Sequence, residues 1–204
     1  MHPAAAFKVG DPEILLARLA DHPFITLAAA PQGRPLVAHV PAIVRREGER
    51  LALDFHLSRG NALAPYMAQG FAAVAASLGP DAYISPDWYV TEGQVPTWNY
   101  VSVEAEGAVS ILEEAGLVAL LDDLSAQEEA RLSPKTPWTR GKMSPGRFEA
   151  MLRGIVGGRL MVERLEGTFK LSQDKPAQDR AGAALALGDH PVARLMADPP
   201  GGSR

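Results

Sequence analysis

Residues 23–57 read PFITLAAAPQGRPLVAHVPAIVRREGERLALDFHL, and this stretch decides the fold class. Three apolar runs, 23–30, 36–46 and 50–57, are separated by short sequences that are rich in glycine and charge. Connections of hairpin length join antiparallel strands. The stretch therefore predicts an antiparallel β-meander. Pro41 lies inside the second run, and we expect it to bend that strand or to place it at a sheet edge, because proline cannot donate to the ladder.

The residues on either side of the meander extend this picture. Asp11 followed by Pro12 is typical of a helix start and predicts a helix that ends near Asp21. Ser58 can cap a helix that runs through Gln69. The apolar run 71–78 indicates a buried strand, and Gly79-Pro80-Asp81 indicates a turn. Strict alternation of polar and apolar residues over 100–106 predicts a half-buried strand.

The second half of the chain changes to helical spacing and then returns to a strand. The expected elements are helices over 113–132 (with a second start at the capping box Ser125–Glu128), a helix from Ser144-Pro145, a strand over 157–170, and helices over 174–187 and 191–196. A late strand most simply closes or extends the earlier sheet. We therefore expect a mainly β protein with helices (α+β), in which a β-barrel-like core carries peripheral helices. The expected organisation is one domain over 1–198, with a helical insertion about 113–155, C-terminal helices about 174–197, and a disordered tail over 199–204.

Composition narrows the class of protein. The chain has 204 residues, of which 47% are hydrophobic and none is cysteine. This excludes bulk disorder, disulfides, a thiol nucleophile and cysteine-ligated metal centres. No apolar run approaches the length of a membrane span, and the first residues do not resemble a signal peptide. The expectation is a soluble cytoplasmic protein without a membrane partner.

Charge is distributed unevenly along the chain. The formal net charge is −4, and residues 60–130 contain no lysine or arginine. Residues 131–164 contain eight basic side chains against two acidic ones. One interpretation is that the acidic and basic segments face each other, within one chain or across a dimer. The other is a basic face for a phosphate or a nucleic acid.

Three segments carry candidate binding chemistry. The segment 83–100 combines Tyr and Trp rings with hydroxyl and amide groups, which suits a planar hydrogen-bonding ligand but is equally expected of an aromatic core. The segment 56–61 lies at a strand end, where Ser58 and Arg59 suit a phosphate. At the end of the late strand, Lys170 and Ser172 fall on one face. The sequence has no P-loop, no nucleophile elbow and no close pair of metal-spaced histidines.

Four strings in these segments resemble the PaiB-like family of FMN-binding negative transcriptional regulators. They are FHLSRGN at 55–61, GPDAYISPDWY at 79–89, VPTWNY at 95–100 and KLSQ at 170–173, and the similarity runs from about Phe7 to Leu187. The resemblance implies an FMN-binding split β-barrel, related to the pyridoxamine-phosphate-oxidase-like flavoproteins. It also implies a homodimer with flavin sites between the subunits.

The resemblance further implies which residues bind FMN. The expected cofactor-binding residues are His56, Leu57, Ser58, Arg59, Asn61, Tyr83, Ser85, Trp88, Thr97, Trp98, Asn99, Lys170, Ser172 and Gln173. No catalytic residue and no metal ligand is indicated. Asp174 stands where the family usually has asparagine, and a carboxylate pointing toward FMN would weaken binding.

The function that this reading favours is that of an FMN-binding transcriptional regulator. Two alternatives remain open. One is a flavin-dependent oxidoreductase on the same barrel. The other is a repressor that contacts DNA directly through the basic segment 131–164, although no DNA-reading motif is evident.

Overall fold

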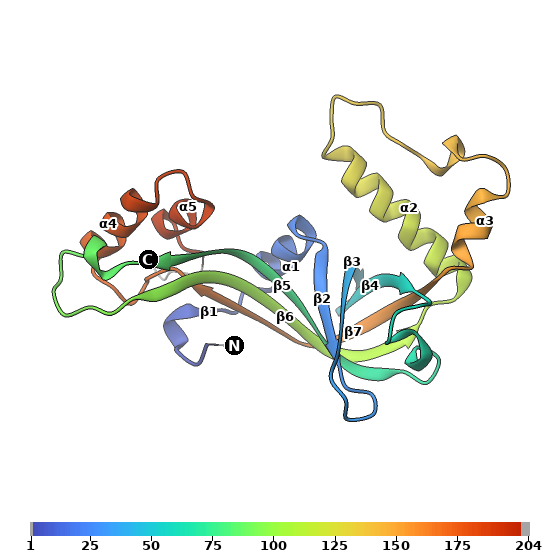
Figure 1. The fold of residues 1–204 in the computed structure, drawn as a ribbon, viewed down its shortest axis with the longest axis horizontal. Helices are drawn as coiled ribbons and strands as arrows, with labels where there is room; N and C mark the ends of the chain where they lie inside the picture. The colour runs from blue at the N-terminus through green and yellow to red at the C-terminus, as the bar shows by residue number, and fades with distance from the viewer. Residues whose placement is uncertain (1, 201–204) are drawn as a thin grey trace. The chain divides into compact units, whose positions relative to one another are not determined.

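The computed structural model describes residues 2–200. Its sheet has the strand order β1-β7-β4-β3-β2-β5-β6, and β7 also pairs with β6. Six strands therefore form a closed antiparallel barrel, and β1 is an extra strand on β7 (Figure 1). The strands are β1 (Lys8–Val9), β2 (Phe24–Ala29), β3 (Leu36–Glu47), β4 (Arg50–Ser58), β5 (Phe71–Ile84), β6 (Thr97–Ile111) and β7 (Ile155–Lys170). The predicted barrel core with peripheral helices is confirmed.

The predicted meander is present, because β2 pairs with β3 and β3 pairs with β4, both antiparallel. The expectation that Pro41 marks an edge strand is wrong, since β3 has a neighbour on each side. Pro41 is the last residue of β3 paired with β2, and Ala42 is the first paired with β4. The missing N–H of proline therefore falls where the strand exchanges one partner for the other.

Helices follow and interrupt the strands. The α-helices are α1 (Pro12–Asp21), α2 (Glu114–Ala130), α3 (Arg147–Leu152), α4 (Ala177–Leu187) and α5 (Pro191–Ala197), and the short 3-10 turns are η1 (Ala5–Phe7), η2 (Ala64–Tyr66), η3 (Pro86–Trp88) and η4 (Arg140–Lys142). The helix predicted from Asp11 ends at Asp21 as expected. Within residues 2–200, no helix is both long enough and apolar enough to span a membrane. The predicted tail 199–204 falls mainly on 201–204, which lie outside the described residues.

The helix predicted from Ser58 to Gln69 is wrong. The chain forms turns there, and only Ala64–Tyr66 is helical, as the 3-10 turn η2. The Asn61 side chain accepts a hydrogen bond from the Leu63 N–H at 2.9 Å, which closes a local turn. Pro65 disfavours the α conformation of the residue before it. Together these two local effects outweigh the capping potential of Ser58.

Two other predictions from the sequence, a turn at 79–81 and a second helix start at Ser125, are wrong. The strand β5 passes straight through Gly79-Pro80-Asp81, where a turn was expected. A Cβ atom at Gly79 would lie 2.9 Å from the Cβ of Val101 on β6 and 2.5 Å from a guanidinium nitrogen of Arg18, so a side chain at this position would crowd the neighbouring strand. The capping box at Ser125 does not start a second helix, because α2 is continuous and Ser125 lies in its interior.

The described chain divides into two compact units, which we name by their content. The barrel unit (19–76 and 105–164) contains β2, β3, β4 and parts of the other three barrel strands, together with α2 and α3. The ribbon unit (2–18, 77–104 and 165–200) contains β1, the remaining parts of β5, β6 and β7, and the helices α4 and α5.

The barrel unit has an apolar layer outside its strands. This layer consists of Ile43 on β3 and three leucines of α2, namely Leu117, Leu120 and Leu124. Gly157 on β7 allows the close packing of this helix, because a Cβ atom would lie 3.2 Å from the Leu117 side chain. The α2 helix therefore covers the outer face of β3, β4 and β7.

Candidate functional site

The loop that follows β4 holds the predicted phosphate-binding residues. The Ser58 hydroxyl accepts a hydrogen bond from the Gly60 N–H at 3.2 Å, and the Asn61 side chain accepts the bond from Leu63 described above. Ser58 and Arg59 are exposed. The short polar side chains thus shape the turn, and they leave the arginine at the surface.

Arg59 joins this loop to the segment between α3 and β7. Its backbone N–H donates to the Gly154 carbonyl at 2.9 Å, and its Nε donates to the Arg153 carbonyl at 3.0 Å. Arg153 is exposed, and within residues 2–200 no side-chain partner exists for it or for the Nη atoms of Arg59. Two cationic side chains therefore belong to one small region of the barrel unit.

Arg153 was missed as an individual site residue. The sequence showed it only as one of eight basic residues in 131–164. The pairing of Ser58 at the end of β4 with Ile155 at the start of β7 brings the two arginine-bearing loops together. No local sequence pattern reports such a long-range pairing.

The two residues before this loop face opposite ways on β4. Leu57 is buried, whereas His56 is half-buried and lines a pocket on the other face. The Nδ1 atom of His56 is buried and has no hydrogen-bond partner among the described residues. Burial lowers the pKa of His56, so its imidazole is neutral at pH 7.

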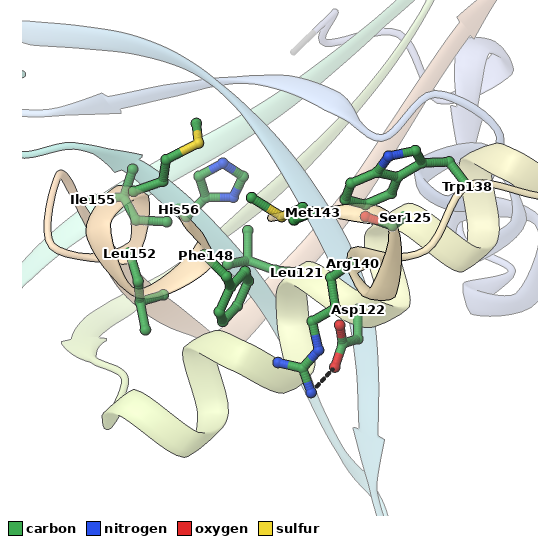
Figure 2. A pocket seen from close by; sticks show the side chains of 11 residues that line it. His56, Leu121, Asp122, Ser125, Trp138, Arg140, Met143, Phe148, Leu152 and Ile155 are labelled. Carbon is green, nitrogen blue, oxygen red and sulfur yellow. Dashed lines mark ion pairs between the residues drawn. The ribbon is translucent and has the colours of Figure 1, made fainter. Parts of the chain in front are cut away.

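The pocket beside His56 has a volume of about 260 Å³ and is mainly apolar (Figure 2). Its lining comes from β4, α2, α3, the start of β7 and the loop between the two helices, and comprises His56, Leu121, Asp122, Ser125, Trp138, Arg140, Met143, Phe148, Met151, Leu152 and Ile155. Arg140 and Asp122 form an ion pair at 3.2 Å, and the Arg140 guanidinium also lies 4.9 Å from the centre of the Phe148 ring. The two charged side chains of the lining thus neutralise each other.

In the ribbon unit, Lys170 is held by the start of β6. Its Nζ donates to the Thr97 hydroxyl and, at 2.9 Å, to the Trp98 carbonyl. Burial lowers the pKa of Lys170, and the charge of Lys175 lowers it further, against an opposing effect of Asp174. Asp174 is exposed and its carboxylate lies 3.8 Å from the Lys175 Nζ.

Next to this lysine lies a buried polar pair. Asn99 is fully buried, and its Nδ2 donates to the Ser172 hydroxyl at 2.9 Å. Ser172 has a φ of +61°, a left-handed conformation that is uncommon for serine. Gln173 bridges the backbone of Phe169 and Leu171. These three side chains are thus engaged in holding the end of β7.

In the predicted aromatic segment, two rings are exposed, and two other predicted residues lie in a turn. Tyr83 and Trp98 are about half exposed and meet edge to face, with ring centres 6.2 Å apart. Ser85 and Trp88 belong to the turn η3, in which the Ser85 hydroxyl accepts a hydrogen bond from the Asp87 N–H at 3.3 Å. The exposed rings are therefore the ones that a ligand can reach.

The structure sorts the fourteen predicted residues into two groups. His56, Leu57, Ser58, Arg59 and Asn61 belong to the barrel unit, and Tyr83, Ser85, Trp88, Thr97, Trp98, Asn99, Lys170, Ser172 and Gln173 belong to the ribbon unit. Within the ribbon unit, direct contacts join Tyr83 to Trp98, Lys170 to Thr97 and Trp98, and Asn99 to Ser172. Within the described part of the chain, no group of three or more His, Asp or Glu side chains is arranged to hold a metal.

The basic segment 131–164 is largely ion-paired within the chain. Its arginines and lysine reach acidic residues of the segment 60–130 in the pairs Arg131–Glu128, Lys135–Glu129, Arg140–Asp122 and Arg164–Glu106. This agrees with the interpretation that the acidic and basic segments face each other.

The chain is similar to known proteins along most of its length. It is 30% identical over 194 residues to the "Protease synthase and sporulation protein PAI 2" of Bacillus subtilis, covering 94% of this chain and 92% of that protein. Among solved structures, an FAD and heme binding protein from Mycobacterium smegmatis superimposes with a TM-score of 0.56 at 18% identity, covering 89% of this chain and 80% of that one. A conserved hypothetical protein from Mycobacterium tuberculosis gives a TM-score of 0.59 at 15% identity, covering 86% and 94%.

At such identities the solved structures show the fold alone, whereas the family rests on sequence. Residues 1–164 match the model of the family described as "Putative FMN-binding domain". The Bacillus subtilis relative matches over nearly the whole of both chains. The chain therefore belongs to this family of FMN-binding split barrels, and FMN is its cofactor.

Proposed function

We propose that this protein is an FMN-binding regulator that acts as a homodimer, with FMN bound at the subunit interface. The observation that carries the proposal is the pair of exposed arginines, Arg59 and Arg153, whose charges are not neutralised within the described residues. FMN brings a phosphate group that carries nearly two negative charges, and forked guanidinium donors match its oxygens.

The residues of the barrel unit fit the phosphate end of FMN. Arg59 is fixed by two bonds, one from its backbone N–H and one from its Nε, so both of its Nη atoms can still donate to a ligand. Ser58 and Asn61 fold the loop that carries it. A cation that is positioned before binding loses less side-chain entropy when the ligand arrives.

The residues of the ribbon unit divide into contacting and positioning roles. Trp98 and Tyr83 expose aromatic surface, and Thr97 and Lys170 present a hydroxyl and an ammonium group beside it. These groups suit the rings and the polar edge of a flavin. The buried residues Asn99, Ser172 and Gln173 hold the strand ends that carry them and act as positioning residues.

A regulatory role is supported by the relative from Bacillus subtilis, whose name refers to protease synthesis and sporulation. When bound, FMN supplies redox chemistry of its own. The chain contributes binding and charge, through Arg59 and Arg153 in one unit and Lys170 in the other. Direct contact with DNA through 131–164 is the weaker alternative, because five basic residues of that segment are ion-paired within the chain.

FMN and riboflavin together test the proposed phosphate site. We expect the purified protein to bind one FMN per chain, and Arg59→Ala to weaken FMN binding by about 10- to 100-fold, the loss expected for a charge-assisted hydrogen bond. Binding of riboflavin, which has no phosphate, is expected to change little. Arg34→Ala is the matched control, because Arg34 is also exposed and lies in the turn between β2 and β3.

Flavin fluorescence titration measures both affinities. A protein that stays colourless after incubation with FMN and desalting would overturn the proposal. Equal losses for FMN and riboflavin in Arg59→Ala would overturn the phosphate assignment alone. Sedimentation velocity of the FMN-loaded protein tests the dimer, and a monomer that retains FMN would contradict the interface.

A further inference from the structure

The pocket beside His56 has features that the FMN proposal does not use. Its residues come mostly from α2, α3 and the loop between them, and they belong entirely to the barrel unit. Figure 2 shows the imidazole of His56 and the ion pair between Arg140 and Asp122 set apart from each other around the pocket. We propose that this pocket binds a second ligand, a neutral and mainly apolar aromatic molecule with one hydrogen-bonding group directed to His56.

Strand pairing explains why the pocket forms here. His56 pairs with Gly157, and Ser58 pairs with Ile155, so these residues share the outer face of the barrel. The missing side chain of Gly157 allows Leu117 of α2 to pack closely. Beyond this contact the helix no longer covers His56 completely, and the loop between α2 and α3 forms the opposite wall.

The lining determines the apolar and aromatic character of the ligand. Trp138, Phe148, Met143 and Met151 present aromatic and thioether surface, and leucine side chains fill the gaps. Sulfur atoms and aromatic edges pack favourably against aromatic rings. The volume of about 260 Å³ is small for a ligand site, which favours a compact ring system.

The charges of the lining determine that the ligand is neutral. Arg140 and Asp122 neutralise each other, and His56 carries no charge at pH 7 because burial lowers its pKa. A carboxylate or an ammonium group in the pocket would lose hydration without gaining a partner. The same argument excludes the flavin ring, since the few polar groups here cannot satisfy its several polar edge atoms.

His56 provides the specific contact. Its buried Nδ1 has no partner among the described residues, and a buried nitrogen without a partner costs free energy. Because Nδ1 is shielded by the protein, the ring nitrogen that pairs with a hydroxyl or N–H group of a ligand is Nε2, which is not among the buried atoms. The proposal assigns His56, which was expected to bind FMN, to this second ligand instead, and the other lining residues were not among those expected to bind the cofactor.

Three related probes test the proposal on the full chain by isothermal titration calorimetry at pH 7.5. 1-Naphthol is neutral and carries one hydroxyl, naphthalene lacks it (measured by displacement of 1-naphthol), and 1-naphthoate is charged. We expect 1-naphthol to bind at one site per chain, naphthalene to bind about 3- to 10-fold more weakly, and 1-naphthoate to bind at least tenfold more weakly than 1-naphthol. His56→Phe is expected to remove the difference between 1-naphthol and naphthalene.

A second pair of variants locates the site. Met143→Trp fills the pocket from a half-buried loop position and is expected to abolish binding of 1-naphthol. Leu132→Trp is the control, because Leu132 is exposed in the same loop and does not line the pocket. Circular dichroism verifies that both variants are folded. Failure of 1-naphthol to bind, or equal binding to Met143→Trp and the control, would overturn the proposal.

The titration is repeated on FMN-loaded protein. Simultaneous binding of 1-naphthol and FMN supports two separate sites. Mutual displacement would overturn the proposal, because the pocket would then belong to the flavin. Loss of FMN binding with retention of 1-naphthol binding would contradict the FMN proposal only.

Discussion

In the barrel unit the buried carboxylate of Asp54 is held by arginine side chains, whereas in the ribbon unit the buried carboxylate of Asp179 is held by backbone N–H groups and lies in the same unit as the buried neutral amide of Asn99. Asp54 is 2% exposed and bonds to Arg159 at 2.6 and 2.9 Å and to Arg45 at 3.1 Å. Asn99 is fully buried and bonds to the Ser172 hydroxyl at 2.9 Å. Both arginines of the barrel unit remain about a quarter exposed.

The comparison shows two ways in which a buried carboxylate is stabilised, by guanidinium groups at Asp54 and by backbone N–H groups at Asp179. The guanidinium groups keep part of their hydration, and they connect β3, β4 and β7 through one carboxylate. Asn99 and Ser172 are both buried from water. Burying a neutral hydrogen-bonded pair costs less hydration free energy than burying a charged pair. In the barrel unit the charges of Arg59 and Arg153 have no acidic partner among the described residues, while Lys170 of the ribbon unit already donates hydrogen bonds to Thr97 and Trp98.

The largest expected effect is on the barrel unit. Asp54→Ala leaves Arg45 and Arg159 without their shared partner, and we expect the free energy of unfolding to fall by about 3 kcal/mol. Glu47→Ala removes only an exposed partner of Arg159 and is expected to cost less than about 1 kcal/mol. Urea unfolding measures both. Similar losses for the two variants would mean that the buried carboxylate is not the centre of this network.

The neutral pair of the ribbon unit is expected to contribute less. Asn99→Ala leaves the Ser172 hydroxyl without its partner and is expected to lower the free energy of unfolding by about 2 kcal/mol. A double-mutant cycle with Ser172→Ala is expected to give a coupling energy of about 1 kcal/mol. Strictly additive losses would show that the hydrogen bond does not stabilise the fold.

Replacing Arg153 is expected to change FMN binding but not the stability of the fold. Arg153→Ala is expected to weaken FMN binding about tenfold, since it removes one cation from the proposed phosphate site. The free energy of unfolding is expected to change by less than about 0.5 kcal/mol, because the side chain is exposed and has no partner in the described chain. FMN titration and urea unfolding of the same samples check the pair of results. A marked loss of stability would show that Arg153 has a structural role, and it would contradict the distinction between Arg153 and the hydrogen-bonded Lys170.

The smallest expected effect concerns pH. Asp179 of α4 accepts hydrogen bonds from the Val90 and Thr91 backbone N–H groups at 2.8 and 3.0 Å. Burial acts to raise the pKa of Asp179, but these bonds and the charge of Lys175 together lower it below its usual value. The carboxylate therefore stabilises the folded state at neutral pH, and this contribution is lost as the pH falls below about 4, through the lowered folded-state pKa.

Comparison with Asp179→Asn isolates that contribution. The wild-type protein is expected to be the more stable one at pH 7, with the two melting temperatures converging as the pH falls toward 3. Melting temperatures that differ by a constant amount over this range would contradict the assignment of the pH dependence to Asp179.

The elements that were predicted correctly from the sequence depend on local rules. Alternation in 100–106 and the short turns of 23–57 required only neighbouring residues to predict strands and their antiparallel order. Two of the failures had tertiary causes. Gly79 indicated a turn, but in the fold its missing Cβ makes room for Arg18. Pro41 indicated an edge, but it lies where β3 exchanges β2 for β4.

Only part of the candidate site could be predicted from the sequence. Residues such as Arg59, Trp98 and Lys170 lie in segments that were identified from their side-chain chemistry, and the resemblance to a family then implied that they bind FMN. The contribution of Arg153 and the pocket beside His56 could not be identified in this way. Both depend on the pairing of β4 with β7 and on the packing of α2 and its following loop over them.

The amino-acid order alone thus determined the strand-rich class, the meander and the family, because backbone periodicity and contiguous motifs are properties of neighbouring residues. Tertiary structure decided which polar groups are buried and hydrogen-bonded within the fold and which remain exposed to a ligand. Asn99 was an expected ligand contact from the sequence, whereas Arg153 was only one of eight basic residues in 131–164. Burial and the hydrogen bond from its Nδ2 to Ser172 hold Asn99 in the fold, with its buried Oδ1 unpaired among the described residues, whereas exposure and the lack of a partner in the described chain leave Arg153 available for binding.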